Sequence, residues 1–62
     1  MKRVYGVRIG TKTAIVYNKR EALKAVKGKE DSRVYSLSYG YFKDCGFVMD
    51  WPTVAAVGDR IA

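Results

Sequence analysis

Apolar residues recur at every second position near the start of the chain, which is the period of a β-strand. Residues 4–9 show this alternation, and residues 13–17 are rich in β-branched side chains. Between them, the Gly10–Lys12 segment has the composition of a tight turn. The pattern therefore predicts a β-hairpin at the start of the chain.

The period then changes to that of a helix. Asn18 is a residue type that caps helix N-termini, and Gly28 is a residue type that follows helix C-termini. These two residues predict a helix over residues 19–27. Its apolar face consists of Ala22, Leu23 and Val26. The partners that we expect to be buried with this face are Val7 or Tyr5, Ile15 and Leu37.

Alternation resumes from Arg33 to Phe42 and predicts a third strand. One face of this strand holds Tyr35, Leu37, Tyr39 and Tyr41. Residues 47–49 follow a Gly-containing turn and could pair back as a short fourth strand. Asp50 to Thr53 resembles a helix start with proline in the first turn, and Gly58 would end that helix.

Together these elements predict a single small α+β domain over residues 1–62. It has an antiparallel sheet of three or four strands, one main helix and a short C-terminal helix, in the order β-β-α-β-(β)-α. A chain of 62 residues has room for one small core. No apolar run approaches the length of a membrane span, so we expect no membrane partner.

Charge is distributed unevenly along the chain. Residues 1–29 contain nine basic residues and one acid, for +8, whereas residues 30–62 contain three basic residues and five acids, for −2. A positive field on one part of a small protein indicates a polyanionic partner, either nucleic acid or an acidic protein surface. The alternative is a solvated surface that keeps the protein soluble.

The residue types needed for catalysis are scarce. The chain has no histidine, and Cys45 is its only cysteine, so an activated nucleophile or a zinc site is hard to build. We therefore expect no enzyme activity, no metal and no cofactor. One cysteine and a first segment without a signal-peptide core also predict a reducing compartment, the cytoplasm.

Residues 5–15, Tyr-Gly-Val-Arg-Ile-Gly-Thr-Lys-Thr-Ala-Ile, resemble the opening of a known domain. It is the RNA–DNA hybrid-binding domain of eukaryotic ribonuclease H1 and of the caulimovirus viroplasmin proteins, which opens with Tyr-Ala-Val-Arg-x-Gly-x-Lys-Thr-Gly-Ile. The match continues without a gap to residue 37, through Glu21, Lys24, Val26, Gly28, Arg33 and Leu37. The resemblance implies the same hairpin, helix and third strand. It also implies contact with nucleic acid through Tyr5, Arg8 and Lys12.

Other features of the family are missing. Its aromatic residue at the helix start is Lys19 here, and its Phe-Lys-Lys on the third strand is Val34-Tyr35-Ser36. The helix that follows the family's third strand is replaced here by residues 39–50, a segment with no counterpart in the family. Because fold does not carry function by itself, specificity for hybrids transfers less well than the fold.

Two functions remain open after this comparison. The first is binding of a duplex with RNA character, such as a hybrid or double-stranded RNA, through its phosphate backbone. The candidate residues for this function are Tyr5, Arg8, Lys12, Lys19, Arg20, Lys24 and Lys27. Tyr35, Tyr39 and Tyr41 could instead stack on unpaired bases, or they could line the core.

The second function is protein interaction, for example as a phage-type inhibitor of a host protein. It would use the basic face together with a C-terminal aromatic patch. The candidate residues for this patch are Phe42, Phe47, Met49 and Trp51. The same four residues could instead close the core.

Overall fold

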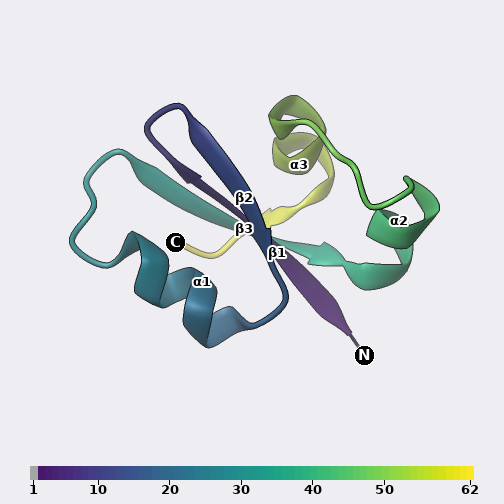
Figure 1. Cartoon of the computed structure of the whole chain (residues 1–62), viewed down its shortest axis with the longest axis horizontal. Coiled ribbons are helices and arrows are strands. Elements are labelled where there is room, and N and C mark those ends of the chain that lie inside the picture. Colours follow the sequence, from purple (N-terminus) through teal and green to yellow (C-terminus); the bar gives the residue numbers. More distant parts are fainter. Residues whose placement is uncertain (1) are drawn as a thin grey trace.

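The computed structural model describes residues 2–62 (Figure 1). In chain order its elements are β1 (Arg3–Ile9), β2 (Lys12–Val16), α1 (Lys19–Val26), β3 (Ser32–Ser38), α2 (Tyr39–Asp44), α3 (Trp51–Val57) and β4 (Asp59–Arg60). The strands form one antiparallel sheet in the order β2-β1-β3-β4. The predicted α+β class, the main helix and the short C-terminal helix are therefore confirmed.

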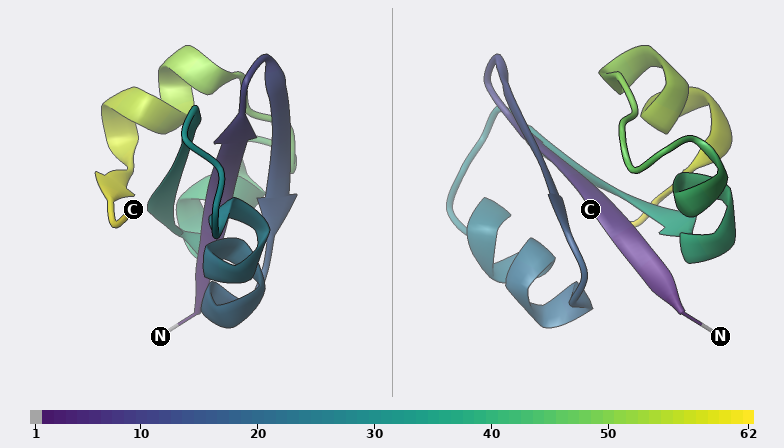
Figure 2. Two further views of the ribbon diagram at one scale, coloured as in Figure 1. Left: turned by 90° about the vertical axis from the view of Figure 1, so that its left-hand side faces the viewer. Right: turned by 45° about the vertical axis from the view of Figure 1, so that its right-hand side comes forward.

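Helices cover both faces of the sheet. Figure 2 shows, in its right-hand view, the strands passing between α1 on one side and α2 with α3 on the other. The side chains of Val7 and Val34 face α1 and are buried with Ala22. On the opposite face, the buried residues are Val4, Leu37, Phe42 and Val54. Successive side chains of a strand point to opposite faces of the sheet. A central strand of a sheet that is covered on both faces therefore needs apolar side chains on both faces, and this is why Val4 and Val7 of β1 are both buried.

The hairpin and α1 follow the local sequence signals. Gly10, at φ 61°, starts the two-residue turn between β1 and β2, a position that glycine favours. The side-chain oxygen of Asn18 accepts hydrogen bonds from the backbone N–H groups of Arg20 and Glu21, at 2.8 and 3.3 Å. Lys27 is the C-cap and Gly28 follows at φ 75°, so the helix ends one residue earlier than predicted.

The third strand is shorter than its alternating pattern predicts. It ends at Ser38, and the next six residues form α2 instead of more strand. The Ser38 hydroxyl caps α2 by accepting a hydrogen bond from the backbone N–H of Tyr41 at 3.4 Å. The turn into α2 places Phe42 in the core, where only 2% of it is exposed. Burial of this ring outweighs the strand propensity of the aromatic residues.

The fourth strand is not at residues 47–49, where the sequence pattern predicted it. Residues 47–49 connect α2 to α3, because Gly46 and Phe47 both have positive φ angles (75° and 62°) that turn the backbone away from the extended form. The fourth strand is β4, which pairs Asp59 with Ser36 and Arg60 with Tyr35. The C-terminal helix begins as predicted, with Asp50 as its N-cap and proline in its first turn.

The face of α1 that meets the sheet differs in part from the prediction. Ala22 is buried and Val26 packs against its cluster, but Leu23 is 37% exposed. Ile15 and Leu37, which were expected under α1, lie on the opposite face with α2 and α3. The prediction assumed one core, whereas the chain divides its apolar residues between two. No helix within residues 2–62 is long and apolar enough to span a membrane.

Candidate nucleic-acid interface

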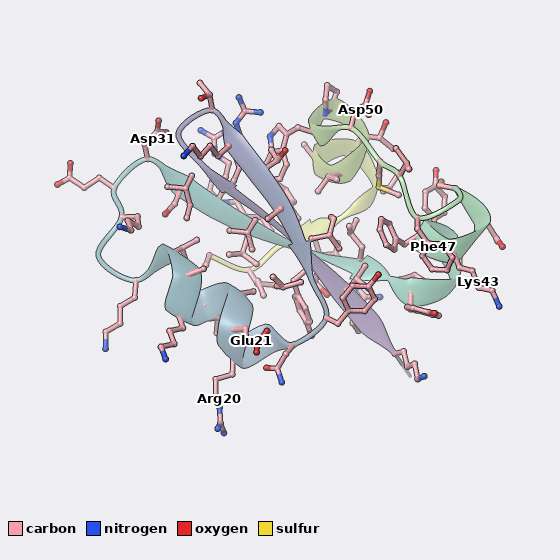
Figure 3. The ribbon with its side chains drawn as sticks, viewed as in Figure 1. Arg20, Glu21, Asp31, Lys43, Phe47 and Asp50 are labelled. Atoms are coloured by element: carbon pink, nitrogen blue, oxygen red, sulfur yellow. The ribbon has the colours of Figure 1, made fainter. Side chains whose placement is uncertain are left out.

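The outer surface of α1 carries a row of cations. Lys19, Arg20, Lys24 and Lys27 are all exposed, and none of these four takes part in a salt bridge. Figure 3 shows Arg20 extending from α1 away from the sheet. The row is possible because Ala22 and Val26 pack on the sheet, which leaves much of the helix surface to polar groups.

A cavity of about 590 Å³ lies at the N-terminal end of this row. We call it the tyrosine cavity. It is lined by Lys2, Arg3, Tyr5, Tyr17, Asn18, Lys19 and Tyr39. These residues come from the start of β1, the connection between β2 and α1, and the start of α2, so the cavity opens where both helical layers meet the same end of the sheet. Three of its residues are cations, three are tyrosines and none is an acid.

The three cations of the cavity differ in how they are held. The Arg3 guanidinium donates a hydrogen bond from Nε to the Ser36 hydroxyl at 2.9 Å, and its Nη2 lies 3.7 Å from a carboxylate oxygen of Asp59. Lys2 places its Nζ 5.6 Å from the centre of the Tyr39 ring, a cation–π contact. Because Arg3–Asp59 is the sole salt bridge within residues 2–62, Lys2 and Lys19 keep their charge unneutralised.

The tyrosines of the cavity are held by packing contacts, which involve other aromatic rings for Tyr17 and Tyr39 and the cluster under α1 for Tyr5. Tyr17 is 59% exposed, and it packs edge-on against Tyr39 and Phe42 at centroid distances of 6.3 and 6.4 Å. Tyr5 packs partly against the cluster under α1. The cavity thus presents aromatic surface that is positioned but not fully covered.

Two of the predicted nucleic-acid residues lie apart from this group. Arg8 is on the α3 face of β1, where its guanidinium stacks 5.6 Å from the Trp51 ring and its Nε donates to the carbonyl of Gly10 at 3.1 Å. Lys12 is exposed at the hairpin tip, paired with Ile9, at the opposite end of β2 from the cavity. Of the seven candidates, the structure therefore groups Tyr5 and Lys19 at the cavity and Arg20, Lys24 and Lys27 on α1.

The four residues of the predicted aromatic patch are also divided. Phe42 belongs to the core, and Met49 and Trp51 pack partly against it, so these three do not form an exposed patch. Phe47 is 49% exposed, and its neighbour Val48, which lies outside the predicted patch, is 77% exposed. They line a groove of about 270 Å³ beside the free edge of β2.

Four residues of the tyrosine cavity were not predicted as binding residues from the sequence: Lys2, Arg3, Tyr17 and Asn18. Tyr39 was predicted only as a residue that stacks on unpaired bases or lines the core. These residues come from distant parts of the chain and meet because β1 pairs with β3 so that Arg3 lies opposite Ser38. The register extends to the backbone N–H of Tyr39, which donates to the carbonyl of Lys2 at 3.3 Å. The alternating pattern predicts the strands but not this register.

Within residues 2–62, no three His, Cys, Asp or Glu side chains come together in a way that could hold a metal ion. Cys45 is an exposed C-cap residue of α2. No protein-family model matches the chain, and the searches of curated proteins and of solved structures returned no significant match.

Proposed function

We propose that this protein binds nucleic acid, and that the cations of α1 contact the phosphates of a duplex with RNA character. The observation that carries the proposal is the row Lys19, Arg20, Lys24 and Lys27, four exposed cations on one helix and its C-cap without salt-bridge partners. Unneutralised cations gain affinity for nucleic acid because their binding to phosphates releases condensed counterions. Binding, not catalysis, is the proposed activity.

The choice of an RNA-containing duplex comes from two features. The amino-acid sequence of the hairpin and of α1 resembles that of the hybrid-binding domain. In addition, RNA duplexes are recognised largely through phosphates and 2′-hydroxyls across a wide, shallow minor groove. A convex helix with a row of cations suits a surface of that kind. We place the binding in the cytoplasm, where exposed Cys45 would remain a thiol.

The test is fluorescence anisotropy with matched 16-base-pair DNA, RNA and hybrid duplexes at two salt concentrations. If the row and its neighbours contact about four to six phosphates, the logarithm of the binding constant falls with the logarithm of salt at a slope of about −3 to −5. The RNA-containing duplexes should bind more tightly than DNA. Absence of binding to every duplex at low salt would contradict the proposal.

A matched pair of variants tests the position of the interface. Lys24 lies in the last turn of α1 and Lys43 in the last turn of α2, and both are exposed. Figure 3 shows Lys43 on the opposite side of the molecule from α1. Lys24→Gln should weaken binding to all sequences and reduce the slope by about one unit. Lys43→Gln, which removes the same charge, should leave affinity and slope nearly unchanged.

The exposure of Val48 favours a second candidate function, binding of a protein partner. Val48 and Phe47 are apolar groups with much of their surface in water, beside an unpaired strand edge, and such surfaces often mark protein contacts. Capture from a lysate treated with nuclease distinguishes this function. A species retained by the wild type and lost with Val48→Ser, but not with Val57→Ser on α3, supports it. Loss of all captured species on nuclease treatment supports nucleic acid.

A further inference from the structure

We infer that the tyrosine cavity binds a single unpaired nucleotide, with its base against tyrosine and its phosphate against lysine. The inference rests on the proposed function and deepens it. It names the preferred ligand as a duplex that carries an unpaired nucleotide at a strand end. The α1 cations would hold the duplex, while the cavity would hold the nucleotide that has left the stack.

The composition of the cavity indicates a ligand that is both anionic and aromatic. Three cations without an acid favour an anion, and Lys2 and Lys19 are the two whose charge is not neutralised by a carboxylate. Three tyrosines favour a flat ring, because bases of every kind stack on aromatic side chains. A nucleotide combines both properties in one small group.

The size of the cavity supports one unpaired nucleotide over paired bases. Its volume of about 590 Å³ lies within the range of small-molecule sites. A base inside a duplex is stacked on both faces and paired along one edge, so it cannot enter a cavity without leaving the helix. An unpaired terminal nucleotide avoids much of that cost.

Two residues are placed to recognise such a nucleotide. Tyr17 is the most exposed tyrosine, and its edge-on contacts with Tyr39 and Phe42 hold the ring in position before a ligand arrives. The side-chain oxygen of Asn18 is occupied by the N-cap hydrogen bonds. Its amide NH₂ group remains as a donor that can reach the edge of a base.

The cavity is also continuous with the α1 row. Lys19 lines the cavity and is the first residue of the helix that carries the other three cations. A strand whose terminal nucleotide enters the cavity can therefore continue along α1 with its phosphates next to cations. This continuity is the reason for choosing a strand end over a free nucleotide.

The test compares two hybrid duplexes of 16 base pairs, one blunt and one with a single unpaired 3′ nucleotide, by fluorescence anisotropy at one salt concentration. The wild type should bind the second duplex about five-fold more tightly or better, the effect expected of one stacked base. Tyr17→Leu should abolish this preference and leave the affinity for the blunt duplex and its salt slope unchanged. Tyr41→Leu, at an exposed tyrosine of α2 outside the cavity lining, should retain the preference.

The outcomes separate this inference from the proposed function. Salt-dependent binding of both duplexes with equal affinity overturns the inference and leaves the proposed function standing. Failure to bind either duplex overturns both. Titration of the wild type with adenosine 5′-monophosphate, followed by amide NMR shifts, tests the cavity without any variant. Shifts should occur at Tyr17, Asn18 and Lys19, and should exceed those caused by adenosine or inorganic phosphate alone. An absence of shifts at these residues counts against the inference.

Discussion

The two helical layers of this protein cover the same sheet but differ in burial and in charge. Beneath α1 the fully buried residues are small: Val7, Ala22 and Val34. Beneath α2 and α3 they include Leu37 and Phe42, with aromatic rings packed around them. Residues 19–29, which contain α1, hold five basic residues and one acid, whereas residues 39–57, which contain α2 and α3, hold one basic residue and two acids.

From this difference we infer that the α1 layer supplies the cationic surface, whereas the layer of α2 and α3 supplies most of the stability. Like charges repel along α1, and a thin core beneath the helix offsets this repulsion only weakly. The larger aromatic core on the other face supplies the greater part of the apolar burial. A small domain is marginally stable, so a cationic surface is tolerated where another part of the fold supplies the stability.

The largest expected effect is on the aromatic side. Phe42 is 2% exposed and contacts both Tyr17 and Phe47 edge-on. Phe42→Ala should reduce the free energy of unfolding by about 3–5 kcal/mol, as measured by urea denaturation. If that variant is unfolded, Phe42→Leu should fold with a smaller loss. A loss below about 1 kcal/mol for Phe42→Ala would show that this side is not the main core.

The next largest effect concerns how closely α3 approaches the sheet. A Cβ atom at Gly6 would lie 2.6 Å from Cγ1 of Val54, a side chain that is itself buried. Gly6→Ala should therefore force α3 outward and reduce the free energy of unfolding by about 1–3 kcal/mol. Thermal unfolding monitored by Trp51 fluorescence measures this change. An unchanged or higher midpoint would mean that α3 packs on β1 less tightly than the structure shows.

On the cationic side we expect a smaller effect. Leu23 is 37% exposed, so Leu23→Ala removes only part of a buried contact and also introduces the best helix former. The expected loss is about 1 kcal/mol or less in the same urea experiment. A loss of about 2–4 kcal/mol, which the sequence pattern predicts for a core leucine, would place Leu23 inside and reverse the orientation of α1.

The smallest expected effect is on the pH dependence of stability, which should differ between the N-cap of α3 and the N-cap of α1. Asp50 caps α3, and its hydrogen bonds from the Thr53 side chain and backbone N–H lower the pKa of its carboxyl below the ordinary value. Its stabilising contribution is therefore present above the unfolded-state pKa of about 4 and is lost as the pH falls through the lower folded-state value.

Asn18 caps α1 with a group that does not titrate. Asp50→Asn keeps an acceptor oxygen and should remove part of the loss of stability that thermal unfolding measures as the pH falls below about 4. The variant Asn18→Ala should lower the free energy of unfolding by an amount that does not depend on pH. Identical pH profiles for wild type and Asp50→Asn would contradict the role of Asp50.

Local signals made two of the helices predictable. Asn18 and Gly28 bracket α1, and Asp50 with Pro52 and Gly58 brackets α3, because caps act on backbone groups within a few residues. The segment after Ser38 was not predictable in this way. Its alternating aromatic residues suit a strand, and the helix is favoured by the Ser38 cap together with the burial of Phe42 beside Val4 and Leu37.

The candidate site was predictable only in part, for a related reason. The cations of α1 follow from helical spacing and were found from the sequence. The tyrosine cavity depends on the register that brings Tyr39 to Lys2, and register is decided by both cores together. The contact of Arg8 with Trp51 could not be predicted from the sequence either, because it depends on where α3 lies.

The most direct test of the account is an amide NMR titration of the protein with a blunt 16-base-pair hybrid duplex. We predict shifts along Lys19–Val26 and little change over Trp51–Val57, so that the cationic layer is the interface and the aromatic layer its support. Shifts concentrated on α3 and at Phe47 and Val48, with α1 unchanged, would contradict this account.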